Sequence, residues 1–301
     1  MNPARGQILL EDARVLAMHR FADEQYVIEI KAPRIASKAT AGSFVHLTCS
    51  AQYPMRRPLS LQRVDPKNGV LEILFKAVGR GTRALSAVNV GDPLSCLGPI
   101  GRGFELDPTR PRPLLIGGGV GIPPMIYLSE TLAQLKSAAS PSSPAPDYKP
   151  FVVLGSEIPF PFQARPSTIL VPHLAADVIA AHPLCEDFGI ASRLASNSGF
   201  AGCYEGYVTQ LAEQWLQGLS EAERSNVAIY SCGPTPMLKA VAQLAARYHL
   251  PAQVSLEEYM ACAVGGCAGC VVKINTPEGP KMQRVCVDGP VFDAHQVVFD
   301  D

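Results

Sequence analysis

PLLIGGGVGIPPMIYLSETLAQLKSA, residues 113–138, marks the start of an α/β region. Its first residues form an apolar run that ends in glycines, which is typical of a buried strand. The rest predicts a helix with Pro123 and Pro124 in its first turn. Further strands are expected at 151–155, 167–170 and 227–233, and further helices near 207–216 and 236–248. Strands that alternate with helices predict a parallel sheet covered on both faces.

The residues before this region read as short strands bounded by turn residues. Alternating or apolar runs at 26–30, 44–47 and 70–78 predict a small antiparallel β-barrel. The fold class expected is an α+β multidomain chain, with a barrel at 1–110, an α/β parallel-sheet domain at 111–250 and a small C-terminal subdomain at 251–301. The Ser-, Ala- and Pro-rich segment Ser137–Pro150 is expected to be a surface loop.

Composition limits the classes of function. The chain has 301 residues, 47% of them apolar, with 26 basic and 27 acidic side chains. This balance excludes a disordered chain and a surface that binds polyanions through bulk charge, so no nucleic-acid partner is expected. The first residues lack a secretory pattern and glycines and prolines interrupt the longest uncharged segment, so we expect no membrane span. Nine cysteines, four of them in the last 40 residues, favour metal ligation in the cytoplasm.

The strongest chemical signal is a cluster of four cysteines. Cys262, Cys267, Cys270 and Cys286 follow the spacing C-x4-C-x2-C-x15-C. This is the plant-type spacing of a 2Fe-2S cluster, in which each iron takes two thiolates. The residues between the first three cysteines are nearly all glycine or alanine, so the loop can wrap tightly. A structural zinc site and free thiols are the alternatives.

Two short motifs suit a phosphate-containing cofactor. In Arg56-Arg57-Pro58-Leu59-Ser60-Leu61 a guanidinium and a hydroxyl lie three residues apart, a fork that can bind a pyrophosphate. An Arg-Pro pair in a β protein is by itself more often a solvated charge on an edge strand. The turn Gly79-Arg80-Gly81-Thr82 follows a strand and starts a helical pattern, which suits the other side of the same pyrophosphate.

Two later turns suit a dinucleotide. The run at 117–124, GGGVGIPP, lies between a strand and a helix, and the run at 230–237, YSCGPTPM, repeats the arrangement. At the carboxyl edge of a parallel sheet both turns face one crevice. Ile122 occupies the position of the last glycine in G-x-G-x-x-G, so a standard Rossmann fingerprint is absent.

These four motifs, in this order, resemble the ferredoxin reductase superfamily over nearly the whole chain. That resemblance implies FAD on the barrel and a nicotinamide nucleotide on the α/β domain. The C-terminal SLEEYMACAVGGCAGCVVKI, followed by RVCVDGPVF, is similar to the electron transfer subunits of NAD-linked, two-subunit dihydroorotate dehydrogenases. Ala263 departs from that pattern, because the family commonly has glycine there.

The resemblance also implies site residues. The FAD contacts would be Arg57, Pro58, Leu59, Ser60, Leu74, Phe75, Lys76, Gly81 and Thr82. The nicotinamide path would be lined by Gly118, Gly119, Cys232, Gly233 and Pro234. Cys232 would lie beside the nicotinamide C4, or would simply be a small residue where strand meets turn. Glu157, just after the second strand, favours NAD over NADP because a carboxylate repels a 2′-phosphate, unless it is merely solvated.

The function that follows is electron transfer from a partner. We expect a catalytic subunit that carries FMN and oxidises dihydroorotate, in a heterotetramer of two plus two chains. Its electrons would pass through the 2Fe-2S cluster and FAD to NAD+ in pyrimidine (UMP) biosynthesis. The first alternative is the flavin and iron-sulfur subunit of an NAD(P)-linked hydrogenase or of a ferredoxin-NADP transhydrogenase. The second is a non-catalytic module with a zinc knuckle.

Overall fold

The computed structural model describes residues 6–50, 52–138 and 146–299. The chain divides into two compact units. The first contains residues 1–104, 255–292 and 296–301, and the second contains 105–254 and 293–295. Among the described helices, none combines the length and apolar character that crossing a bilayer requires.

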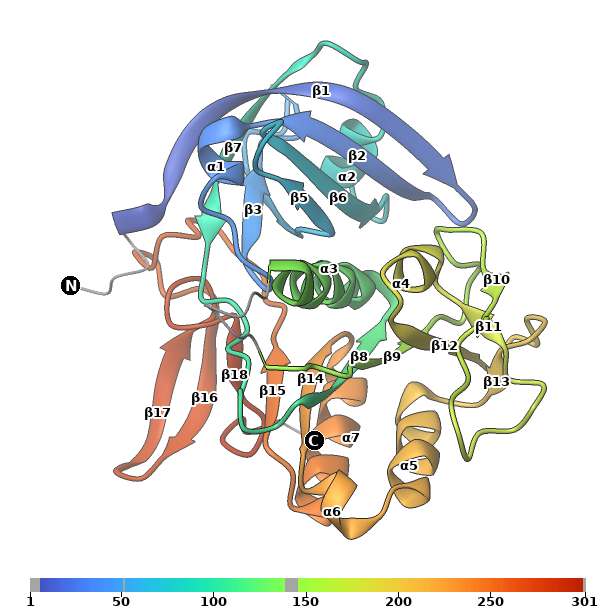
Figure 1. The fold of residues 1–301 in the computed structure, drawn as a ribbon. Helices are drawn as coiled ribbons and strands as arrows, with labels where there is room; N and C mark the ends of the chain where they lie inside the picture. The colour runs from blue at the N-terminus through green and yellow to red at the C-terminus, as the bar shows by residue number, and fades with distance from the viewer. Residues whose placement is uncertain (1–5, 51, 139–145, 300–301) are drawn as a thin grey trace. The chain divides into compact units, whose positions relative to one another are not determined.

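The N-terminal part of the first unit is a curled antiparallel sheet (Figure 1). Its strands are β1 (Leu9–Phe21), β2 (Gln25–Lys31), β3 (Phe44–Leu47), β4 (Arg57–Ser60), β5 (Arg63–Asp65), β6 (Val70–Lys76) and β7 (Pro93–Ile100), with helices α1 (Pro33–Ala36) and α2 (Arg80–Leu85). The strand order is β4-β3-β7-β1-β2-β6-β5. The sheet curls into a half-barrel, so that β4 and β6 approach each other although they lie far apart in this order.

Alternating side chains build the core of the half-barrel. Ile28 lies opposite Ile73, and Ile30 lies opposite Leu71, in the antiparallel pairing of β2 with β6. All four side chains are completely buried. A period of two places every second residue on the inner face, so the alternating run at 26–30 predicts this strand correctly.

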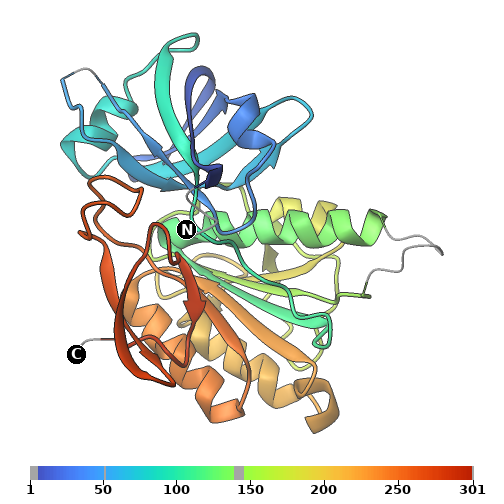
Figure 2. The same cartoon turned by 90° about the vertical axis from the view of Figure 1, so that its left-hand side faces the viewer.

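Most of a largely parallel sheet between helices belongs to the second unit, although the division places the last residue of its strand β15 and the first two of its strand β18 in the first. Its strands are β8 (Arg112–Gly118), β9 (Phe151–Gly155), β12 (Ala191–Ser196), β13 (Tyr204–Glu205), β14 (Val227–Cys232), β15 (Ala252–Ser255) and β18 (Val291–Asp293), in the order β13-β12-β9-β8-β14-β15-β18. Its main helices are α3 (Ile122–Ala138), α5 (Val208–Gly218) and α7 (Thr235–Tyr248). Helix α3 covers one face, and α5 and α7 cover the other (Figure 2). Leu114, Leu115 and Ile116 are consecutive and fully buried, as a strand covered on both faces requires.

The expected strand at 167–170 is wrong. Those residues are irregular and Leu170 is 85% exposed. They belong to an excursion between β9 and β12 that holds β10 (Arg165–Pro166), β11 (Ala180–Ala181) and α4 (Pro183–Asp187). The third parallel strand is β12, whose sequence ASRLAS has no β-branched residue and therefore gives little strand signal. Its Ser192 is completely buried and its hydroxyl accepts the N–H of His182 at 3.0 Å.

The expected surface loop at 137–150 lies partly outside the described residues, which omit 139–145. Its first two residues belong to α3. Its last residues are anchored: Tyr148 is buried, and the N–H of Lys149 donates to the carbonyl of Pro111 at 2.7 Å.

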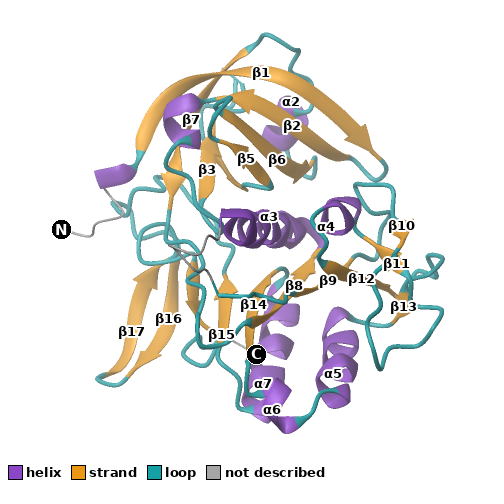
Figure 3. Cartoon of the chain, viewed as in Figure 1, coloured by secondary structure: helices purple, strands orange, loops and turns teal. Residues whose placement is uncertain are grey.

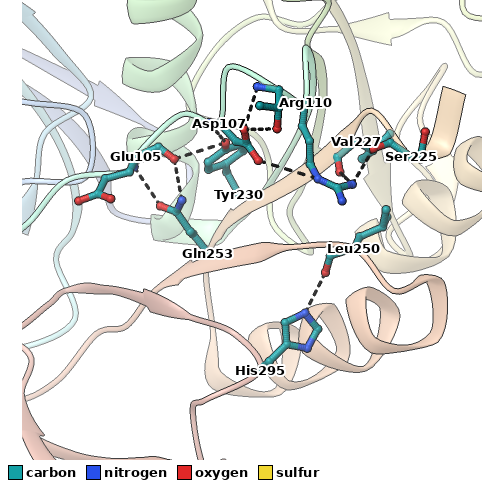
Figure 4. Close-up of polar contacts among 10 residues, drawn as sticks. Glu105, Asp107, Arg110, Ser225, Val227, Tyr230, Leu250, Gln253 and His295 are labelled. Atoms are coloured by element: carbon teal, nitrogen blue, oxygen red, sulfur yellow. Dashed lines mark hydrogen bonds and ion pairs between the residues drawn. The ribbon is translucent and has the colours of Figure 1, made fainter. Parts of the chain in front are cut away.

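Polar contacts tie the first residues of the second unit to its sheet (Figure 4). The N–H of Glu105 donates to Oε1 of Gln253 at 3.0 Å, and the N–H of Asp107 donates to the hydroxyl of Tyr230 at 3.1 Å. Arg110 donates to the carbonyl of residue 225 at 2.7 Å. These bonds fix residues 105–110 against β14 and β15.

The C-terminal part of the first unit is a loop followed by a hairpin. Figure 3 shows the segment between β15 and β16 as loop, and this segment holds three of the four clustered cysteines. The hairpin pairs β16 (Val271–Thr276) with β17 (Gly279–Arg284) in antiparallel register. Two short elements of the second unit remain. Helix α6 (Glu221–Arg224) lies between α5 and β14 in the chain, and the 3-10 turn η2 (Gly119–Gly121) precedes α3.

Candidate functional site

The carboxyl ends of four parallel strands bring the predicted nucleotide residues to one edge of the sheet. β8 pairs with β9 on one side and β14 on the other, and β12 follows β9. The chain order therefore reverses between β8 and β14, and ligands of open α/β sheets bind at such a switch point. Gly118 and Gly119 lie on one side of it, and Cys232 to Pro234 lie on the other.

Glycines let the two turns at the switch point touch. A Cβ on Gly121 would lie 2.3 Å from the carbonyl oxygen of Cys232, and a Cβ on Gly118 would lie 2.5 Å from Sδ of Met237. Gly119 differs, because its φ is +55° and no other described segment lies within 4 Å of where its Cβ would be. Gly119 is therefore the predicted glycine whose backbone a phosphate can approach.

The second turn is more closed. A Cβ on Gly233 would lie 2.4 Å from Cε of Met237, and Pro234 is the N-cap residue of α7. Cys232 has no exposed surface. This burial fits a small residue where strand meets turn, and a place beside the nicotinamide C4 stays a prediction.

Glu157 lies at the same edge, just after β9, where the loop after β12 holds its carboxylate. Oε1 accepts the side-chain Nδ2–H of Asn197 at 3.0 Å, and Oε2 accepts the backbone N–H of Asn197 at 3.2 Å. The Ser198 hydroxyl donates to the carbonyl of Glu157 at 2.7 Å. The carboxylate is thus fixed rather than freely solvated. Asn197 is absent from the predicted set, and recognising β12 would have placed it at this edge.

In the first unit, the predicted FAD residues gather where β4 approaches β6 and α2. A Cβ on Gly81 would lie 2.7 Å from Nε of Arg57, so the Arg57 guanidinium covers Gly81. Arg57 is further held by a bond from Nη1 to the carbonyl of Met55 at 2.8 Å. Arg56 is directed elsewhere, because its Nη2 donates to the Ser95 hydroxyl at 3.1 Å. The structure therefore selects Arg57 as the arginine of the fork that lies beside the phosphate turn.

Hydroxyl and strand residues complete this region. The Thr82 hydroxyl accepts the N–H of Gly79 at 3.1 Å and so closes the start of α2. Leu74 and Phe75 are buried, so their side chains pack inside the half-barrel, and only Lys76 of these three is partly exposed. The register of β5 with β6 ends before residue 73, which leaves one backbone edge of residues 73–76 without a strand partner among the described strands.

Pro58, Leu59 and Ser60 belong to β4, whose one partner among the described strands is β3. Ser60 is half-buried at the end of β4, where the strand approaches β6.

The four clustered cysteines lie as two pairs. Cys262 contacts Cys267, and Cys270 contacts Cys286. Sγ of Cys262 accepts the N–H of Gly266 at 3.3 Å and that of Cys267 at 3.4 Å. Glycines in the loop thus allow its N–H groups to face sulfur, which stabilises anionic ligands.

This pairing suits two metal ions better than one. A 2Fe-2S cluster takes two thiolates on each iron, whereas structural zinc needs four ligands around one ion. Within residues 6–50, 52–138 and 146–299, no three His, Cys, Asp or Glu side chains converge as a single ion requires.

The two pairs differ in acidity. Burial disfavours ionisation of Cys262, but N–H groups of residues 264, 267 and 266 and the Cys267 thiol outweigh it and lower its pKa to about 6. Burial raises the pKa of Cys286 to about 12, and Cys270 adds to this increase. The exposed side of the loop therefore stabilises negative charge on sulfur more strongly than the buried side does.

An arginine anchors the loop from the hairpin. Arg284 donates through Nη1 to the carbonyl of Gly265 at 3.1 Å, and its Nε lies 2.9 Å from Oδ2 of Asp288. Asp288 raises the pKa of Arg284 by hydrogen bonding and by charge. Sequence reasoning missed both residues, although they flank Cys286 within a short motif. Ala263 has φ of 55°, a conformation that favours glycine and strains alanine modestly.

Relatives with known names share this chain's sequence over nearly its whole length. Residues 257–298 match the family described as the iron-sulfur cluster binding domain of dihydroorotate dehydrogenase B. The dihydroorotate dehydrogenase B (NAD(+)) electron transfer subunit of Desulforamulus reducens is 33% identical over 291 residues, which cover 96% of this chain and 98% of that protein. The chain belongs to this family. Membership among the dihydroorotate dehydrogenase B electron transfer subunits confirms the resemblance and the oxidoreductase function expected from the sequence.

Solved structures confirm the fold expected for a dihydroorotate dehydrogenase B electron transfer subunit. The NADH-dependent reduced ferredoxin-NADP oxidoreductase has a TM-score of 0.73 at 23% identity, covering 95% of this chain and 89% of that chain. A ferredoxin NADP+ reductase from Neisseria gonorrhoeae, solved with bound FAD and NADP, has a TM-score of 0.54 at 14% identity, covering 79% and 91%. Both likenesses show a ferredoxin-reductase-like fold.

Proposed function

We propose that this electron transfer subunit accepts electrons from an FMN-containing dihydroorotate dehydrogenase subunit and delivers them to NAD+. When bound, a 2Fe-2S cluster supplies single-electron steps, and FAD joins these to the two-electron chemistry of the nicotinamide. The observation that carries the proposal is the loop with two cysteine pairs, because paired thiols fit a binuclear, one-electron carrier. The product would enter pyrimidine (UMP) biosynthesis.

The cluster residues divide between two irons. Cys262 and Cys267 would hold one iron, and Cys270 and Cys286 would hold the other. The N–H groups on Sγ of Cys262 support this assignment, because they stabilise a charged cluster and influence its potential.

FAD would bind where β4 approaches β6 and α2. The free backbone edge of residues 73–76 and Ser60 would bind the flavin ring, and the guanidinium of the half-buried Arg57, which lies over Gly81, would bind the pyrophosphate. Leu74 and Phe75 would act through their backbone only, since their side chains are buried.

NAD would bind at the switch point of the second unit. The backbone at Gly119 is open to a phosphate, and the turn Cys232–Pro234 faces it across the reversal in strand order. Glu157 would meet the ribose and favour NAD over NADP. FAD would thus bind to residues 1–110, NAD to residues 111–250, and the cluster to residues 251–301.

The catalytic partner would be a separate chain. The relatives are named as electron transfer subunits, which supports a partner that holds the dihydroorotate site. We propose a heterotetramer of two plus two chains in the cytoplasm, where nine free cysteines suit a reducing environment. The hydrogenase and transhydrogenase alternatives are not favoured, because the named relatives match over the full length.

The test uses the complex of this chain with its catalytic subunit. Cys267→Ser removes the exposed member of one proposed ligand pair, and Cys203→Ser changes a half-buried cysteine outside the loop. We expect Cys267→Ser to retain NADH oxidation by a dye that accepts electrons from FAD, but to lose dihydroorotate-dependent NAD+ reduction. Cys203→Ser should retain both activities.

Iron content and visible absorbance are measured on the same samples, so that loss of the cluster is established directly. Equal loss of both activities in Cys267→Ser, with FAD still bound, would contradict the proposed order of carriers.

A further inference from the structure

Two neighbouring strand ends in the second unit hold a fixed carboxylate. β9 and β12 pair in parallel, with Gly155 opposite Ala195, so Glu157 and Asn197 each lie two residues beyond that pair. Asn197 donates to both carboxylate oxygens of Glu157, at 3.0 and 3.2 Å. The backbone and the side chain of Asn197 thus both bind the Glu157 carboxylate, which fixes the plane of the carboxylate as well as its position.

The Glu157 carboxylate can still accept further hydrogen bonds. A carboxylate has about four acceptor sites, and Asn197 uses two of them. Within the described part of the chain, no lysine or arginine forms an ion pair with Glu157. The side chain is exposed at the edge of the sheet where a dinucleotide would bind. Its free acceptor sites suit a vicinal diol, and its uncompensated charge repels a phosphate.

Aromatic residues follow Glu157 and Asn197 closely in the sequence. Phe160 follows Glu157 by three residues, and Phe200 follows Asn197 by three. Their ring centroids are 6.0 Å apart in an edge-to-face arrangement, and both side chains are half-buried. The ring centroid of Phe162 lies 5.2 Å from that of Phe160. Aromatic faces of this kind stack on a nucleobase whatever its sequence context.

We propose that Glu157, Phe160 and Phe200 form the adenosine subsite of the nucleotide, and that Asn197 is the positioning residue that sets its specificity. The ligand class is an adenosine diphosphate ribosyl group with a free 2′-hydroxyl. Asn197 acts through Glu157, and a 2′-phosphate is rejected because the held carboxylate cannot turn away from it. This inference rests on the proposed function, because it specifies how the proposed NAD site distinguishes NAD from NADP.

The test measures binding of ADP-ribose and of its 2′-phosphate analogue to the intact complex by calorimetry. In Asn197→Ala, we expect ADP-ribose to bind about tenfold more weakly, and the preference over the 2′-phosphate analogue to fall by a similar factor. Ser198→Ala is the matched control, since its hydroxyl bonds only to the Glu157 backbone carbonyl. It should keep the wild-type preference.

A double variant separates positioning from direct contact. If Asn197 acts through Glu157, then Glu157→Gln with Asn197→Ala should lose no more discrimination than Glu157→Gln alone. Phe200→Ala should weaken both ligands equally and leave their ratio unchanged. Melting temperatures of all variants within a degree or two of wild type exclude a general loss of fold.

The outcomes separate this inference from the proposed function. If the wild type reduces NAD+ and prefers ADP-ribose, but Asn197→Ala has the same preference, Asn197 has no positioning role and the proposed function stands. If wild-type protein neither binds ADP-ribose nor reduces NAD+ with dihydroorotate, the proposed function itself is overturned.

Discussion

Replacing Gly81 by alanine should weaken FAD binding without lowering the stability of the folded protein. The added Cβ would lie 2.7 Å from Nε and 2.9 Å from Cζ of Arg57. Ordinary contact begins near 3.4 Å, so the guanidinium must move by about 0.7 Å or more. Because it lies at the end of a flexible side chain, the movement costs little in folding. It does remove the arginine from the position proposed for the pyrophosphate.

The substitution should raise folding stability but lower FAD affinity. Alanine in place of glycine inside α2 should add about 0.5–1 kcal/mol to the free energy of unfolding. A lost hydrogen bond to a charged group costs about 1.5–3 kcal/mol, which corresponds to a rise of roughly tenfold to a hundredfold in the FAD dissociation constant. Gly79→Ala is the matched control, because no other described segment lies within 4 Å of its Cβ position.

The assay is FAD titration of the apoprotein, followed by flavin fluorescence, alongside thermal unfolding of each variant. We expect Gly81→Ala to bind FAD weakly and melt no lower than wild type, and Gly79→Ala to bind FAD normally. Wild-type FAD affinity in Gly81→Ala would refute the placement of Arg57 at the pyrophosphate.

The remaining predictions concern folding stability. Gly121→Ala should lower the free energy of unfolding by about 1–3 kcal/mol, because its Cβ would lie 2.3 Å from the backbone carbonyl of Cys232, and an unchanged denaturation midpoint would contradict the close packing of the two turns. His46 is buried, and burial lowers its pKa from 6.5 to about 4, because the charges of Arg56 and Arg57 add to the effect of burial and a hydrogen bond with the Arg56 backbone opposes it only in part. Protonation of His46 therefore favours the unfolded state. The free energy of unfolding has its full value above pH 6.5 and should be about 2 kcal/mol lower at pH 5. His46→Gln should remove that part of the acid dependence in urea titrations at pH 7 and 5.

Much of the fold could be predicted from sequence because local and tertiary preferences agree. The run at 113–138 is apolar, then glycine-rich, then helical, and β8 and α3 follow it closely. The alternation at 26–30 gives β2. The cysteine spacing likewise identifies the loop, since the close spacing of Cys262, Cys267 and Cys270 confines their sulfurs to a small volume.

The rest depends on contacts that sequence patterns do not show. β12 is a strand because β9 and the helices bury it, although its serines and alanines have low strand propensity. Because the sequence pattern does not indicate β12, it does not indicate that Asn197 lies at the end of a strand either. The family resemblance implies that Leu74 and Phe75 contact FAD, but their burial leaves only the backbone for that role. Arg284 acts across 19 residues on Gly265, a distance at which no local pattern links them.

The central claim is that electrons from dihydroorotate reach NAD+ through this chain. The most direct measurement is dihydroorotate-dependent NAD+ reduction by the complex that co-purifies with the tagged protein from its own cells. We predict a complex with FMN, FAD and iron that reduces NAD+ when dihydroorotate is added and forms orotate in equal amount. A complex that contains flavin and iron but shows no such activity would contradict the claim.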